Sequence, residues 1–162
     1  MQVDEIAILD LASSELHFFS SLKELTLRSA NHIESENMED LMSVLQEKQV
    51  LISRYKVFAE EWNKIGLSLE IKDGYYNPDF WNLLFQIFEA KSSKKGPFSV
   101  KLRELIGQTK TLAEELVKIE DGLQEALNEY VKRLRIRISQ ISKGRDACKG
   151  YASAGGAPLF GR

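Results

Sequence analysis

Few residues in this chain of 162 have the types and spacing that catalysis or metal binding requires. The two histidines, His17 and His32, lie 15 residues apart, and the single cysteine, Cys148, is remote from both in the sequence. A closed zinc site takes four such ligands, and a nucleophilic cysteine needs a neighbouring base. The histidines are interpreted as exposed or interhelical side chains, and no catalytic residue, metal site or cofactor site is expected.

Paired carboxylates have a plainer explanation than acid–base catalysis. Glu60-Glu61 and Glu114-Glu115 are adjacent in the sequence, and adjacent residues of a helix point in different directions. No glycine-rich phosphate loop follows a strand-like segment. Solvated helix faces explain these acids, and the sequence indicates a protein that is not an enzyme.

The charged residues are distributed unevenly. The formal net charge is −2, but residues 1–71 carry −7 and residues 72–162 carry +5. From Lys132 to Arg162 there are eight basic residues and one acid. Helix-dipole compensation, solvation or an acidic protein partner can explain this basic end. Nucleic-acid binding is disfavoured, because few aromatic residues, Tyr130 and Tyr151 among them, lie near enough to stack on bases and no module motif accompanies them.

The composition is that of a globular domain, with 43% hydrophobic and 28% charged residues. It excludes a fully disordered chain, a collagen-like chain and a disulfide framework. No segment approaches the ~18 consecutive apolar residues of a membrane span, and the acidic N-terminus lacks the basic region of a secretory signal. A cytoplasmic location is expected, since one cysteine cannot form an internal disulfide.

Apolar residues spaced four and three apart predict a first helix over about residues 3–34, with Glu15 and Ser29 as flaws in its stripe. Asn37, a favourable N-cap, starts a second helix that is predicted to run to residue 71. Three rows of apolar residues repeat along this second helix, and Lys48 falls in one of them. Such a wide face suits a helix wedged between two others, although part of it is left open as a seam for a partner.

A short aromatic-rich helix is predicted over about residues 78–90. Asn77-Pro78-Asp79 supplies a cap, a proline at the first helical position and a negative charge behind it. The residues from Phe80 to Phe88 are apolar almost all round. This helix is either part of the core or an exposed docking element.

The last helix is predicted over about residues 99–143. Together these elements predict an all-α fold, an elongated antiparallel bundle of three long helices with coiled-coil character, with the short helix inserted between the second and the last. Residues 1–143 are expected to form the bundle and residues 144–162 a flexible glycine-rich tail. A last helix of roughly 45 residues exceeds a compact globule, so the bundle is elongated, or this helix breaks near Gly122 or protrudes.

Three sequence blocks stand out along these parts: Asn37-Met38-Glu39-Asp40-Leu41, then Glu47-Lys48-Gln49-Val50-Leu51-Ile52, and finally Lys143-Gly144-Arg145 followed six residues later by Tyr151. These blocks and the order of the helices resemble the FlgN-type flagellar export chaperones, which serve hook–filament junction proteins. The resemblance covers most of the chain except about residues 66–98, where the aromatic insert departs from the simplest form of the family.

The resemblance implies a small, non-catalytic cytoplasmic protein that binds hook–filament junction subunits before export. It also implies delivery of those subunits to the export gate of the flagellar type III apparatus. Substrate binding in the family is placed on the C-terminal amphipathic region. In this sequence the implied partner-binding residues are Leu123, Leu127, Tyr130, Leu134, Ile138, Ile141 and Tyr151.

The residues themselves favour a similar mechanism. The apolar stripe of the last helix extends beyond the length of the first two, so a client helix can lie there with its acidic residues against Arg135, Arg137 and Lys143. The alternative is a structural coiled-coil adaptor that homo-oligomerises through the same stripe, and a homodimer is left open. No nucleic-acid partner and no membrane span are expected.

Overall fold

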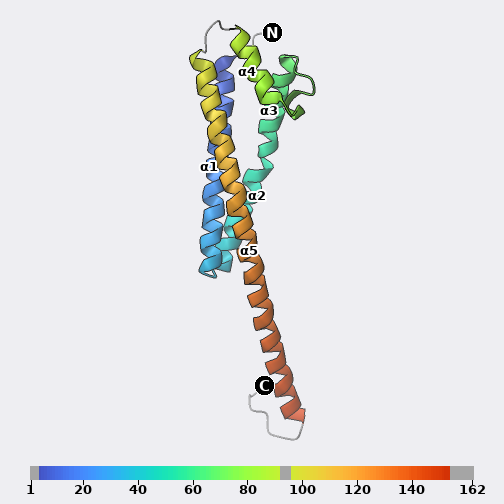
Figure 1. Ribbon diagram of the computed structural model, residues 1–162. Helices are drawn as coiled ribbons and strands as arrows, with labels where there is room; N and C mark the ends of the chain where they lie inside the picture. Colours follow the sequence, from blue (N-terminus) through green and yellow to red (C-terminus); the bar gives the residue numbers. More distant parts are fainter. Residues whose placement is uncertain (1–3, 92–95, 154–162) are drawn as a thin grey trace. The chain divides into compact units, whose positions relative to one another are not determined.

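A computed structural model describes residues 4–91 and 96–153 (Figure 1). These residues are almost entirely helical and contain no strand, which confirms the all-α prediction. The chain divides into two compact units, Met1–Asp121 and Gly122–Arg162. The elements in order are α1 (Glu5–Glu34), α2 (Met38–Ser53), α3 (Tyr55–Ser68), the 3-10 helix η1 (Gly74–Tyr76), α4 (Phe80–Lys91) and α5 (Pro97–Ser153).

In the first unit, α1 and the beginning of α5 lie side by side and run in the same direction (Figure 1). Lys23 Nζ lies 3.0 Å from Glu115 Oε2, and three residues further along α1, Thr26 Oγ1 lies 3.2 Å from Glu120 Oε1. Because the contact positions increase together on both helices, the two helices are parallel.

The two consecutive helices α2 and α3 run antiparallel to α1. Arg28 of α1 pairs with Glu47 of α2 at 3.7 Å, whereas Glu15 of α1 bonds to Trp62 of α3. The contact position on one helix falls as it rises on the other. The first unit therefore confirms part of the predicted bundle, in which successive long segments alternate in direction.

The prediction of one continuous helix over residues 37–71 is wrong, because the chain turns at Arg54 between α2 and α3. The Ser53 hydroxyl donates to the Val50 carbonyl at 2.6 Å, and the Arg54 N–H bonds three residues back to Leu51 at 3.1 Å. These bonds replace the regular i→i−4 pattern and tighten the turn. The spacing of apolar residues continues through the turn, so periodicity alone does not reveal it.

The aromatic-rich helix belongs to the core. In α4, Phe80 is 2% exposed and Leu84 is fully buried, and Trp62 of α3 is fully buried beside them. The ring centroids of Trp62 and Phe80 lie 6.4 Å apart in an edge-to-face arrangement. Of the two interpretations that the sequence left open for this helix, the structure therefore supports the core.

The connection from α3 to α4 packs unusually closely. Asp73 and Gly74 adopt left-handed backbone conformations, with φ of 64° and 56°. The Asn63 side chain accepts a hydrogen bond from the Tyr75 N–H at 3.1 Å and so holds this turn against α3. A Cβ atom at Gly66 would lie 2.9 Å from the Phe80 ring, so only glycine fits there without a shift.

One polar junction joins three helices at the far end of the first unit. Lys48 of α2 is buried and forms an ion pair with Glu120 of α5. The same carboxylate oxygen lies 3.2 Å from the hydroxyl of Thr26, which is itself fully buried on α1. Lys48 occupies a position that the sequence pattern assigns to the apolar face, and Glu120 explains how its charge is accommodated there.

The last helix is longer than predicted. It begins at Pro97 rather than near residue 99, passes through Gly122 without a break and reaches Ser153. The predicted end at Lys143 and the predicted start of a flexible tail at residue 144 are therefore wrong for residues 144–153. The rest of that tail, residues 154–162, lies outside the described residues, as do residues 1–3 at the predicted start of the first helix.

Candidate partner-binding surface

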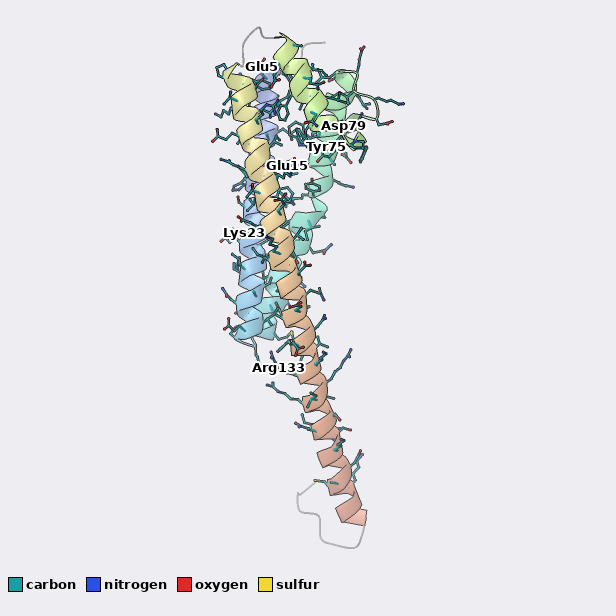
Figure 2. The ribbon with its side chains drawn as sticks, viewed as in Figure 1. Glu5, Glu15, Lys23, Tyr75, Asp79 and Arg133 are labelled. Atoms are coloured by element: carbon teal, nitrogen blue, oxygen red, sulfur yellow. The ribbon has the colours of Figure 1, made fainter. Side chains whose placement is uncertain are left out.

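The second unit exposes most of its helix. Between Val131 and Gly150, every residue except the half-buried Leu134 is exposed to solvent. Figure 2 shows side chains projecting from this part of α5, with Arg133 labelled. A helix that buries none of its faces has no packing to stabilise it except contacts along its own length or a partner.

Four apolar residues on this helix form a continuous line, which we call the stripe: Val131, Leu134, Ile138 and Ile141. Val131 is 40% exposed, Ile138 is 65% exposed and Ile141 is 63% exposed. At 3.6 residues per turn, the four positions fall within an arc of about 80°. They therefore present one narrow apolar line along the helix.

The predicted binding residues divide by burial. Leu123 and Tyr130 are only 4% and 5% exposed, so neither offers surface to a partner. Leu127 and Leu134 are half-buried, whereas Ile138 and Ile141 are open to solvent. The seventh, Tyr151, lies in the last turn of α5, and its side chain lies outside the described part of the structure.

Sequence reasoning omitted one exposed member of the stripe from its binding residues, Val131, although the four-three spacing that includes it was visible. A further exposed isoleucine, Ile136, is 58% exposed but lies on the opposite face of the helix from the stripe. This second isoleucine has the same residue type and similar exposure without belonging to the surface. It is therefore a natural control.

Basic side chains border the stripe. Arg135 and Arg137 occupy the two positions that flank it, and Arg145 and Lys149 continue its line toward the C-terminus. Residues 131–149 hold seven basic residues and a single acid, Asp146. The surface can therefore bury apolar side chains and attract negative charge at the same time.

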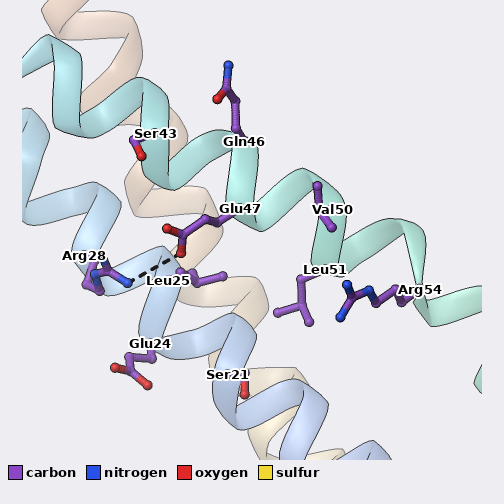
Figure 3. A pocket seen from close by; sticks show the side chains of 10 residues that line it. All are labelled: Ser21, Glu24, Leu25, Arg28, Ser43, Gln46, Glu47, Val50, Leu51 and Arg54. Carbon is purple, nitrogen blue, oxygen red and sulfur yellow. Dashed lines mark ion pairs between the residues drawn. The ribbon is translucent and has the colours of Figure 1, made fainter.

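Two of the grooves in the described part of the first unit border α1. An apolar groove of about 770 Å³ lies between α1 and the α2–α3 turn, lined by Phe18, Phe19, Leu22, Ile52, Ser53, Tyr55, Lys56 and Ala59. A more polar groove of about 540 Å³ lies between α1 and α2 (Figure 3). Its floor contains Leu25 and Leu51, and the Arg28–Glu47 ion pair crosses one end. Both grooves are open, and neither contains a group of titratable side chains arranged for catalysis.

The described residues offer little else for chemistry. No three His, Cys, Asp or Glu side chains among them gather as a metal site, and Cys148 is exposed. None of the helices in residues 4–91 and 96–153 has an apolar stretch of the length that crossing a bilayer needs. No protein-family model matches the chain, and no curated protein or solved structure matches it either.

Proposed function

We propose that this protein is a flagellar export chaperone of the FlgN type, which binds hook–filament junction subunits in the cytoplasm. In this proposal a helical end of the subunit lies along the stripe of α5, and the complex is delivered to the export gate. The protein carries out no covalent chemistry.

The observation that carries the proposal is the exposed stripe on a helix that has no other visible use for it. Solubility disfavours a line of exposed isoleucines unless a partner covers it for part of the protein's lifetime. An amphipathic helix that pairs with a second amphipathic helix is an established mode of peptide recognition. The sequence blocks that resemble the family add the identity of the client.

Two other aspects of the molecule support a binding role for α5 over the aromatic helix. The phenylalanines of α4 are buried in the core, where Phe80, Phe85 and Phe88 are each at most 6% exposed. They are therefore not available to a client. The described residues also lack a cluster that suits a metal or a nucleophile.

The alternative function is a structural adaptor that homo-oligomerises through the same stripe. The charges on this helix oppose it. Two copies paired through the stripe would bring together two helices that are each strongly basic, with Arg145 and Lys149 on the pairing line of each.

The test is co-purification of the full chain with hook–filament junction subunits. The variant Ile138→Asp/Ile141→Asp places two carboxylates on the stripe at exposed positions, so we expect it to lose the client and keep its helical content. Ile136→Asp introduces the same residue on the opposite face and should retain the client. Unchanged client binding by the stripe variant would exclude this surface, and a tight oligomer of the wild-type chain that ignores the subunits would favour the adaptor.

A further inference from the structure

We propose that the helix that pairs with the stripe is acidic: one apolar seam, carboxylates on both sides of it, and further carboxylates at the end that meets Arg145 and Lys149. This inference rests on the proposed function, since it names the chemical class of partner for the same surface. It concerns any client or delivery factor that uses the stripe.

The width of the stripe limits the partner to one helix. Val131, Leu134, Ile138 and Ile141 follow one another at spacings of three, four and three. This is the spacing of a two-helix seam, in which each side chain inserts between four residues of the facing helix. A sheet or a second bundle would need a broader apolar face than the stripe provides.

The flanks of the stripe specify the charge of that helix. Arg135 directly follows Leu134, and Arg137 directly precedes Ile138, so the two arginines border the seam on opposite sides. In a paired helix these flanking positions meet the corresponding flanks of the partner, and opposite charges there set partner choice. Glutamate or aspartate at those positions in the partner therefore matches both sides of the seam.

Beyond Ile141 the seam itself becomes basic. Arg145 lies one turn past Ile141, and Lys149 lies one turn further on the same line; both are exposed. An apolar residue opposite them would gain nothing, whereas a carboxylate would neutralise a charge on the contact line. The partner helix is therefore asymmetric, with an apolar portion followed by an acidic end.

Other occupants fit the same residues less well. A second copy would place Arg145 opposite Arg145 in a parallel pair, and its helix is also strongly basic. A lipid surface favours a broad apolar face with basic residues at its edges, but here the apolar line is narrow, two bases lie on it, and Ile136 lies opposite. An acidic helix satisfies the narrow seam and the basic line together.

The experiment uses the full chain and two synthetic helical peptides with identical leucine and isoleucine seams. One peptide has glutamate at all flanking positions and an acidic end, and the other has lysine at the same positions. We expect fluorescence anisotropy to show at least about tenfold tighter binding of the glutamate peptide, with an affinity that falls as salt rises.

A charge reversal tests whether the flanks are responsible. Arg135→Glu/Arg137→Glu should remove most of the preference for the glutamate peptide, because only Arg145 and Lys149 on the contact line still favour it. The matched control is Lys132→Glu/Lys143→Glu, which makes the same change in net charge at exposed positions away from the stripe. The prediction that Lys143 borders the client is wrong for a straight helix, since this residue falls about 160° around the helix from the centre of the stripe. The control should lower affinity modestly but preserve the preference.

Equal binding of the two peptides by the wild type, or an unchanged preference in the flank variant, would overturn the inference. So would self-association of the chain that displaces the peptide, or stronger binding to vesicles with anionic lipid than to the glutamate peptide. Junction subunits are assayed in parallel. If the subunits bind and the two peptides bind equally, the proposed function stands and the acidic partner is excluded. If the glutamate peptide binds and the subunits do not, the acidic partner stands and the proposed function is excluded.

Discussion

Glu15 and Trp62 meet inside the first unit, where the indole N–H donates a hydrogen bond to the carboxylate over 2.5 Å. The side chains belong to α1 and α3, and neither residue is more than 5% exposed (Figure 2 labels Glu15). Burial raises the pKa of Glu15, and the hydrogen bond from Trp62 offsets part of that effect. Burial also raises the pKa of Tyr55 and Tyr75.

Replacing this carboxylate by an amide should change how stability depends on pH. Because the pKa of Glu15 is raised in the native state, protonation of this residue favours the folded protein. This contribution to the free energy of unfolding is fully present below the unfolded-state pKa of 4.5 and is lost as the pH rises through the native pKa. Glu15→Gln keeps an acceptor for Trp62 but cannot ionise. We therefore expect its stability advantage over the wild type to grow as the pH rises above 4.5.

Urea denaturation at several pH values measures this difference. Glu60→Gln, which changes an exposed acid on α3, is the control and should follow the wild type at every pH. A constant difference between Glu15→Gln and the wild type would show that Glu15 does not titrate in this range.

The ion pair of Lys48 and Glu120 should contribute more to the stability of the fold than an exposed ion pair does. Lys48→Met removes the buried cation and leaves the carboxylate with only the nearby Thr26 hydroxyl. Because the Glu120 side chain is 40% exposed, water recovers part of the loss, and we expect a destabilisation of about 1–3 kcal/mol.

The double variant Lys48→Met/Glu120→Leu removes both charges and should recover most of that stability, as measured by chemical denaturation. Lys110→Met on the exposed surface of α5 is the control and should change stability by less than about 0.5 kcal/mol. If the destabilisation of the double variant equals the sum of those of Lys48→Met and Glu120→Leu alone, the two charges do not interact.

Gly66 should not tolerate a side chain. A Cβ atom there would approach the Phe80 ring to 2.9 Å and the Gly74 Cα to 3.1 Å, and neither the ring nor the backbone turn can move freely. Gly66→Ala should therefore cost about 1–3 kcal/mol of unfolding free energy.

A helical glycine with open surroundings is the matched control. Nothing lies within 4 Å of a Cβ atom at Gly107, so Gly107→Ala should stabilise the protein by about 0.5–1 kcal/mol through helix propensity. Thermal unfolding of the two variants should shift in opposite directions. Equal shifts would contradict the close packing at Gly66.

Asn37 should stabilise the start of α2. Its side-chain oxygen accepts a hydrogen bond from the Asp40 N–H at 3.2 Å. Asn37→Ala removes this acceptor and should cost about 1 kcal/mol, whereas Asn37→Ser should retain most of the stability. Asn82→Ala, at an exposed position within α4, should have little effect in the same thermal unfolding assay.

The local features of the helices could be predicted from the sequence because they depend on neighbouring residues. The cap at Asn37 and the apolar period of α1 are read from residues three or four apart, and both appear in the structure. The turn at Arg54 was not predictable in this way, since no proline or glycine marks it and the apolar spacing continues across it.

Burial within the predicted binding surface could not be read from the sequence. Leu123 and Ile138 belong to the same apolar pattern, yet one is 4% exposed and the other 65%. A helical period reports which residues share a face, but it cannot report how far along the helix that face is covered.

The sequence by itself determined that this protein is helical, where its second helix begins, and that its basic residues gather at one end. Those properties follow from short-range spacing and from composition. Only the tertiary structure decided that the aromatic helix is core and that Glu15 and Lys48 are paired inside the first unit. Both depend on contacts between residues far apart in the chain; Glu15 and Trp62, for example, are 47 positions apart.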